Sequence, residues 1–124
     1  MKKTLLLILS IVSITTLSAT EPAAAYKMLT EGKAVIVDVR EEDEIKLGMI
    51  EKALWFPLSK VNNDKNWKEQ FQKLTQGKQI FLYCRSGNRS EKVKNILKAN
   101  SIESENIGGF ESLKKQLPTQ RGVK

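Results

Sequence analysis

Two short, nearly continuous apolar runs constrain the fold of this chain more than any other feature. They lie at residues 34–39 and 80–83, and β-branched residues dominate the first. A strand that is apolar at successive positions is buried on both faces, as in parallel sheets covered by helices. Asp38 and Arg40 stand at the end of the first run, and Cys84 directly follows the second. The sequence therefore predicts central parallel strands with polar side chains at their carboxyl ends.

Helical patterns alternate with these strands along the chain. Helices are expected at residues 22–30, 41–47, 58–74 with a break near 62–64, 90–99 and 110–117. Further strands are expected at residues 53–56 and 103–107, and the tail from Pro118 is expected to be loose. Strands that alternate with helices predict one three-layer α/β domain, with a mostly parallel central sheet and helices on both faces.

The N-terminus has the composition of an export signal. Two lysines precede an apolar run over residues 5–17, and small residues follow. A positive start and a short apolar core are typical of signal peptides, whereas a membrane-spanning helix needs about 20 apolar residues. We expect residues 1–19 to be a signal peptide cleaved after Ser18 or Ala19, and residues 20–124 to form one exported domain in the bacterial periplasm. An uncleaved membrane anchor is the alternative.

The charge of the chain is basic but scattered. The formal net charge is +7, from 21 basic and 14 acidic residues, without a run of five or six like charges. A nucleic-acid partner is therefore not expected. We also expect no stable membrane association once the signal is removed. A modest positive field favours small anions as ligands.

Cys84 is the only cysteine, and it opens the run Cys84-Arg85-Ser86-Gly87-Asn88-Arg89-Ser90 before a predicted helix. A loop between a strand and a helix directs backbone N–H groups and the positive end of the helix dipole at its first residue. Together with the two arginines, these donors are expected to lower the pKa of the thiol and make it nucleophilic. The alternative, an inert buried cysteine, fits poorly with such polar neighbours.

The chain contains no histidine, which removes whole classes of reaction. Cys-His and Ser-His-Asp arrangements are impossible, so the thiolate must be stabilised by backbone dipoles and arginines. One cysteine with carboxylates is also a poor set of zinc ligands. We therefore expect neither a metal nor a cofactor. A single cysteine likewise cannot form a disulfide within the chain.

Four segments resemble the rhodanese-like sulfurtransferase family and occur in the family's order. They are the Asp-Val-Arg motif within residues 36–42, the glycine-to-proline segment 48–57, the cysteine loop 84–90 and the Gly-Gly turn within residues 106–110. The small size and the predicted signal are most similar to the periplasmic, phage-shock-protein-E type of thiosulfate sulfurtransferase. One departure is Met49, where many members carry a histidine, and which we interpret as core filler.

The resemblance implies a double displacement through a persulfide on Cys84. The thiolate takes the outer sulfur of thiosulfate, sulfite leaves, and cyanide or another thiol then removes the sulfur. The expected partners are therefore a small anionic sulfur donor and a thiophilic acceptor. Asp38 and Arg40 are expected to support the loop, and Arg89 is equally open to structural pairing with a carboxylate. The residues expected to bind the substrate are Arg85, Ser86, Gly87, Asn88, Arg89 and Ser90.

Two other functions remain open from the sequence. A cysteine phosphatase or arsenate reductase also places a cysteine loop at a helix N-terminus, but cysteine phosphatases use a loop one residue longer than that from Cys84 to Arg89. The third hypothesis is a persulfide carrier or stress-response binding module without efficient turnover.

Ser86 and Ser90 are expected to support the loop and to cap the following helix.

Overall fold

The computed structural model describes residues 19–122. Residues 1–18, which hold almost all of the predicted signal peptide, lie outside the described residues, as do residues 123–124. Within the described part of the chain, no helix is long and apolar enough to cross a membrane. The predicted cleavage sites and the uncleaved anchor therefore stay predictions.

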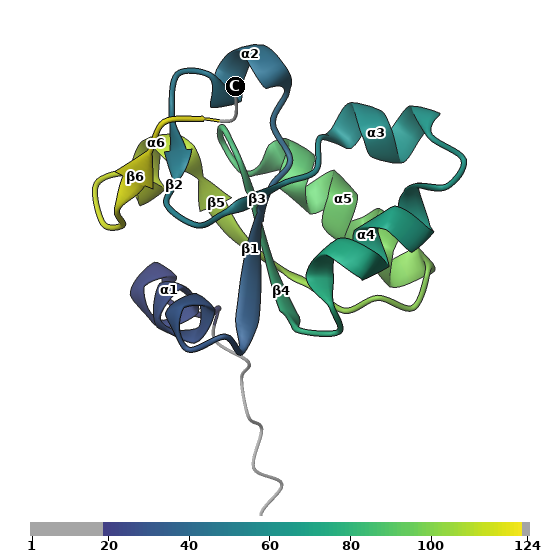
Figure 1. Ribbon diagram of the computed structural model, residues 1–124, viewed down its shortest axis with the longest axis horizontal. Coiled ribbons are helices and arrows are strands. Elements are labelled where there is room, and N and C mark those ends of the chain that lie inside the picture. The colour runs from purple at the N-terminus through teal and green to yellow at the C-terminus, as the bar shows by residue number, and fades with distance from the viewer. Residues whose placement is uncertain (1–18, 123–124) are drawn as a thin grey trace, which may run out of the picture.

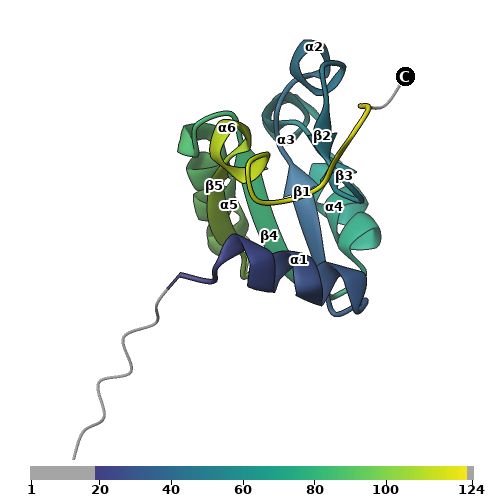
Figure 2. The same cartoon turned by 90° about the vertical axis from the view of Figure 1, so that its left-hand side faces the viewer.

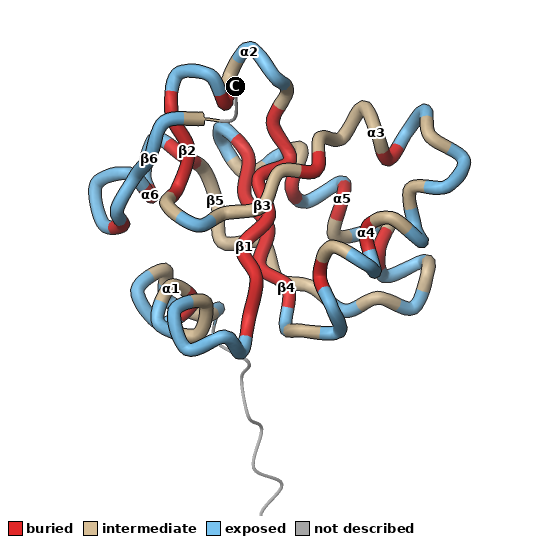
Figure 3. Tube along the Cα trace, viewed as in Figure 1, coloured by how far each residue is buried: buried red, intermediate tan, exposed pale blue. Residues whose placement is uncertain are grey.

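A four-stranded parallel sheet forms the centre of the molecule (Figure 1). Its strand order is β3 (Leu54–Trp55), β1 (Ala34–Asp38), β4 (Gln79–Cys84) and β5 (Glu105–Gly109). Every residue of β1 is buried, as is every residue of β4 except Gln79, so these two middle strands appear as the red centre of Figure 3. The predicted parallel α/β sheet is confirmed.

Helices cover both faces of the sheet and complete the three layers, as predicted (Figures 1 and 2). One face carries α1 (Pro22–Thr30) and α6 (Phe110–Leu113), and the other carries α3 (Leu58–Asn63), α4 (Trp67–Thr75) and α5 (Asn88–Ala99). The short helix α2 (Glu42–Ile45) lies beyond the carboxyl ends of the strands. The expected break near residues 62–64 separates α3 from α4.

Each face of the sheet has its own apolar core. Val35 and Val37 of β1 pack towards α3, α4 and α5, where Phe56 meets Phe71 edge to face with ring centroids 5.2 Å apart. The alternate residue Ile36 belongs to the second core, beneath α1 and α6. Because successive side chains of a strand point to opposite faces, one continuous apolar run serves both cores.

The C-terminal tail differs from the prediction. Thr119–Gln120 forms strand β6, which pairs antiparallel with β2 (Met49–Ile50). The backbone N–H of Glu51 also donates to the carbonyl of Pro118 at 2.9 Å. The expectation of a loose tail from Pro118 is therefore wrong, because backbone hydrogen bonds to a buried segment hold it in place.

Some element boundaries also differ from the predictions. Helix α5 begins at Asn88, two residues before the predicted start, because Gly87 turns the chain directly into the helix. Strand β5 runs to Gly109, so the two glycines belong to the strand and not to a separate turn.

In the register of the sheet, Asp38 lies beside Tyr83, and Cys84 lies beside Gly109. The carboxyl ends of three strands therefore meet at one edge.

Candidate active site

The sulfur of Cys84 lies at the N-terminus of α5. Gly87, at the N-cap position of the helix, has φ 94°, a left-handed conformation that glycine adopts without a steric penalty. Its backbone N–H donates to Cys84 Sγ at 3.0 Å. The hydroxyl of Ser90, in the first turn, lies 3.3 Å from the same sulfur. Strand, loop and helix thus direct hydrogen-bond donors at one atom.

These donors decide the ionisation of Cys84. Burial disfavours the charged thiolate, but the Ser90 hydroxyl and the backbone N–H groups of Ser90, Ser86 and Gly87 outweigh it, so the pKa of Cys84 is lowered. The shift has the predicted direction. Only 1% of the residue is exposed, so the sulfur lies beneath its loop and not on the surface. Burial alone does not make this thiol inert, because its neighbours are donors that favour the anion.

The loop residues predicted to bind the substrate lie in different environments. Arg85, Ser86 and Asn88 are exposed, whereas Ser90 is fully buried. Neither predicted serine caps the helix, because Gly87 occupies the N-cap position and provides no side chain. Ser90 instead points towards the sulfur from inside the first turn.

Arg89 is held by a carboxylate from another element. Its Nη1 and Nη2 donate to Glu44 Oε1 and Oε2 of α2 at 2.5 and 2.7 Å. This hydrogen-bonded pairing lowers the pKa of Glu44 and raises that of Arg89. Glu44 Oε1 also accepts the backbone N–H of Glu41 in the capping box of α2. The structural pairing that the sequence left open is therefore present, and substrate binding by Arg89 stays a prediction.

Asp38 and Arg40 form a buried ion pair at the end of β1. Arg40 Nη2 donates to Asp38 Oδ2 at 2.8 Å and to the Gly48 carbonyl at 2.7 Å. The guanidinium carbon also lies 4.2 Å from the centroid of the Phe110 ring and 5.8 Å from that of Tyr83. Among the described residues, its hydrogen bonds go to β1 and residue 48 and not to the cysteine loop. Arg40 contacts Tyr83, the residue before Cys84, and its support of the loop stays a prediction.

Tyr83 was not singled out from the sequence, yet it connects the site to the tail. Its hydroxyl accepts the backbone N–H of Ile50 at 3.0 Å, so the residue before Cys84 is fixed to β2. Burial, reinforced by the Asp38 carboxylate, raises the pKa of Tyr83 well above its ordinary value. Tyr83 therefore stays a neutral phenol, and it acts here as a structural anchor.

Asn106 and Gly109 of β5 form the wall beside the loop. Asn106 hydrogen-bonds Ser90 Oγ, Gly87 O, Glu91 Oε2 and Gly108 N. A Cβ on Gly109 would collide with the carbonyl of Arg85, so the loop packs directly on this strand end. In the sequence, these residues were recognised only as part of the Gly-Gly motif of the family, and their contacts with the loop were not predicted. A polar residue near the carboxyl end of a neighbouring strand was the available signal.

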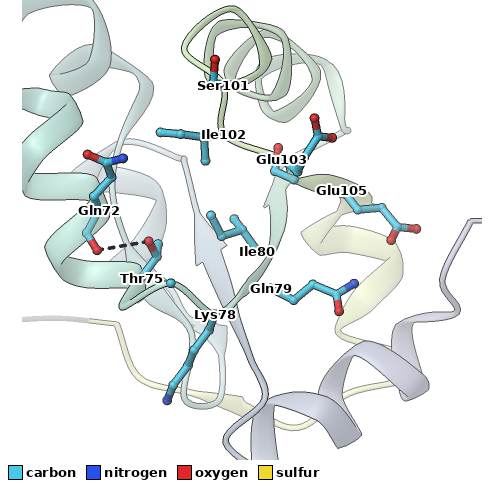
Figure 4. Close-up of a pocket in the computed structure, with 11 residues that line it drawn as sticks. Gln72, Thr75, Lys78, Gln79, Ile80, Ser101, Ile102, Glu103 and Glu105 are labelled. Carbon is cyan, nitrogen blue, oxygen red and sulfur yellow. Dashed lines mark hydrogen bonds between the residues drawn. The ribbon is translucent and has the colours of Figure 1, made fainter.

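A separate cavity lies at the opposite end of the sheet. It has a volume of about 610 Å³, and Gln72, Thr75, Gln79, Ile80 and Ile102 contribute to its wall (Figure 4). Gln79 and Cys84 are five positions apart along β4, a distance of about 16 Å in a strand. Within residues 19–122, no group of three or more His, Cys, Asp or Glu is placed to hold a metal. This cavity therefore lies apart from the Cys84 loop.

The family model of the rhodanese-like domain matches residues 21–116 of this chain. The chain belongs to the rhodanese-like domain family. Solved structures agree with the fold. A rhodanese-related protein from Thermoplasma volcanium is 22% identical with a TM-score of 0.66, covering 82% of this chain and 96% of that one. A rhodanese-like domain protein from Staphylococcus aureus is 28% identical with a TM-score of 0.60, covering 77% and 90%.

Curated relatives of this rhodanese-like domain have differing names. A mitochondrial protein of Schizosaccharomyces pombe, provisionally assigned as a thiosulfate sulfurtransferase, is 35% identical over 83 residues, covering 61% of this chain and 57% of the relative. The tRNA uridine(34) hydroxylase of Rickettsia typhi is 32% identical over 79 residues, covering 64% and 32%. The chain thus spans about a third of the hydroxylase and under two thirds of the yeast protein.

Proposed function

We propose that this rhodanese-like domain is a thiosulfate sulfurtransferase that carries sulfane sulfur on Cys84. One observation carries the proposal: the sulfur receives the Gly87 N–H and faces the Ser90 hydroxyl at the N-terminus of a 12-residue helix. This environment favours a thiolate without a general base, and the chain has no histidine to serve as one. Sulfur transfer from an anionic donor needs no such base.

The proposed reaction proceeds in two displacements. The Cys84 thiolate attacks the outer sulfur of thiosulfate, an S–S bond forms, and the bond to the sulfonate sulfur breaks with its electron pair leaving on sulfite. A thiophile such as cyanide then attacks the outer sulfur of the persulfide. Thiocyanate leaves and the Cys84 thiolate is regenerated. The donors that hold the thiolate also stabilise the terminal charge of the persulfide.

Arg85 is the proposed contact for the sulfonate group of the donor. Its side chain is exposed beside the buried Cys84, whereas Arg89 is engaged with Glu44. Guanidinium groups bind oxyanions through charge-assisted hydrogen bonds. We therefore propose that Arg85 binds the sulfonate group, and that Arg89 holds the geometry of the loop.

A persulfide carrier is the second candidate function. The burial of Cys84 favours it, because a sulfur beneath the loop is protected from bulky thiols. A carrier loads sulfur once and releases it only to its partner, whereas an enzyme turns over repeatedly with thiosulfate and cyanide. Multiple turnovers of thiocyanate formation per protein molecule support the enzyme, and a single stoichiometric release supports the carrier.

We also propose that the domain is exported to the periplasm, as in the phage-shock-protein-E type. The support is the basic and apolar pattern of residues 1–19, together with the small domain that follows. Expression of the full chain in a bacterium, followed by fractionation and N-terminal sequencing, tests this proposal. A protein in the periplasmic fraction that begins at residue 19 or 20 supports it, and an intact N-terminus in the cytosol overturns it.

A further inference from the structure

Asn106 stands beside the cysteine loop with its carboxamide fixed in one orientation. Oδ1 accepts the Gly108 N–H at 3.0 Å, and a backbone N–H can only donate. Nδ2 donates to the Gly87 carbonyl at 2.9 Å and to Glu91 Oε2 at 3.0 Å, and these oxygens accept. Exchanging the oxygen and nitrogen would break all three contacts. Oδ1 is thereby presented to Ser90 as an acceptor.

The hydroxyl of Ser90 faces three acceptors and has one hydrogen to give. They are Asn106 Oδ1 at 2.8 Å, the Gly87 carbonyl at 3.1 Å and Cys84 Sγ at 3.3 Å. A hydroxyl has one O–H donor, and it turns to suit its partner. The shortest contact holds it on Asn106, and a negative charge on the sulfur draws it towards Cys84.

We propose that Asn106 is a positioning residue that sets the stability of the Cys84 thiolate. It acts through the Gly87 N–H, because its Nδ2 holds the Gly87 carbonyl, whereas its Oδ1 competes with the sulfur for the single Ser90 hydrogen. Holding Gly87 keeps its left-handed conformation and aims its N–H at Sγ. The role of Asn106 in sulfur transfer rests on the proposed function, whereas its effect on thiol ionisation does not.

The charged groups around Cys84 do not mask an effect of Asn106 on the titration of the thiol. Arginines stay protonated and carboxylates ionise well below the range of a thiol, so their charges stay constant while Cys84 titrates. A change in the titration of Cys84 therefore reports on its hydrogen bonds. The charged residues on the packed elements include Asp38, Arg40, Glu44, Arg85, Arg89, Glu91 and Glu111.

The test is the pH dependence of the alkylation of Cys84 by iodoacetamide, followed by intact mass. Only the thiolate reacts, and the chain has no second cysteine. In a Ser90→Ala background, where only the Gly87 route remains, Asn106→Ala is expected to shift the midpoint upwards by about one pH unit, which lowers the thiolate fraction about tenfold below the midpoint of Ser90→Ala. Asn106→Asp is expected to shift it further, because its carboxylate faces the Gly87 carbonyl and Glu91.

Asn100→Ala is the matched control. Asn100 lies at the other end of α5, where its Nδ2 donates to the Ile96 carbonyl, and its variant should keep the wild-type midpoint. In the wild-type background, Asn106→Ala should cause a smaller upward shift than in the Ser90→Ala background, because it also frees the Ser90 hydrogen for the sulfur. Circular dichroism checks that each variant is folded.

A midpoint that Asn106→Ala leaves unchanged in the Ser90→Ala background would overturn the inference, as would a smaller upward shift there than in the wild type. Alkylation requires no thiosulfate. If the wild-type protein never takes up sulfur, the proposed function is wrong, but the titration still tests whether Asn106 affects the ionisation of Cys84. If transfer occurs, Asn106→Ala should lower kcat at neutral pH and leave the KM for thiosulfate nearly unchanged.

Discussion

Burial and hydrogen bonding have opposite effects on the pKa of Cys84. The residue is 1% exposed, yet its pKa is lowered because the Ser90 hydroxyl and three backbone N–H groups outweigh the cost of burying a charge. The alkylation rate of a thiol rises with pH as the thiolate forms. A lowered pKa therefore moves this rise to lower pH than for an ordinary cysteine.

Replacement of Ser90 by Ala tests the contribution of its hydroxyl. Among residues 19–122, Ser90 provides the one side-chain donor that contacts the sulfur, so we expect its loss to raise the alkylation midpoint by about one pH unit. Ser112→Ala, at an exposed position of α6, is the control. Coincident profiles for wild type and Ser90→Ala would mean that the backbone N–H groups alone stabilise the thiolate.

Replacement of Arg85 by Ala tests anion recognition. We expect the KM for thiosulfate to rise about tenfold with little change in kcat, because a charge-assisted hydrogen bond to an oxyanion is lost. Steady-state kinetics of thiocyanate formation give both constants. Lys115→Ala, an exposed cation on the turn after α6, is the control for general charge. Equal effects of the two variants would remove Arg85 from the proposed donor site.

Residue-scale predictions from the sequence were best where neighbours in the chain make the contact. The Cys84 environment followed from a strand, a glycine and a helix within one short segment. The Arg89–Glu44 pair could not be predicted from local sequence, because Glu44 lies 45 residues away and only the packing of α2 brings it to the loop. The contacts of Asn106 were missed for the same reason.

At the scale of elements, the pairing of Arg89 with Glu44 joins α2 to the N-terminal turn of α5. Both side chains are about a quarter exposed, at 28% and 24%, so solvent screens part of their attraction. Because the folded pKa of Glu44 is lowered, its contribution to stability is present above its unfolded pKa. That contribution is lost as the pH falls through the lower folded value.

A double-mutant cycle measures this link. Arg89→Ala and Glu44→Ala, alone and combined, should show a coupling free energy of about 1 kcal/mol in urea unfolding at neutral pH. The coupling should shrink in acid as Glu44 becomes protonated. Lys73 and Glu69, an exposed pair on α4, provide a reference cycle with weaker coupling. Additive effects at both pH values would leave the two elements energetically independent.

Long elements were predicted well, whereas the two-residue strands β2 and β6 were not predicted. The strand from residue 34 and the helix over residues 22–30 have patterns long enough to reveal burial on both faces or on one. Strands β2 and β6 have two residues each, and their pairing depends on the path of the whole tail. No local pattern marks such a strand, which explains the wrong expectation of a loose tail.

At the scale of the whole molecule, the parallel sheet gathers residues from distant segments at one edge. The ends of β1, β4 and β5 bring Asp38, Cys84 and Gly109 into neighbouring positions, although they span most of the described chain. The sequence predicted this gathering, because parallel strands share an edge for their carboxyl ends. It did not predict how Arg40 and Tyr83 would tie that edge to residues 48–50.

Loss of the buried guanidinium should affect the whole fold. Arg40→Met leaves the Asp38 carboxylate unpaired at 0% exposure, and we expect a loss of about 3–5 kcal/mol in the free energy of unfolding. Urea titration of the wild type and the variant measures it. Lys73→Met, which breaks an exposed pair, should cost less than about 1 kcal/mol. Similar losses for both variants would contradict a structural role of the Asp38–Arg40 pair.

The central claim is that Cys84 accepts sulfur, and intact-protein mass spectrometry tests it most directly. The purified wild-type protein is weighed before thiosulfate, after thiosulfate, and again after cyanide, beside Cys84→Ser as the matched control. We predict that the wild type gains the mass of one sulfur atom and loses it to cyanide, while folded Cys84→Ser gains nothing. An unchanged mass of the wild type after thiosulfate, or an equal gain in Cys84→Ser, would contradict the account.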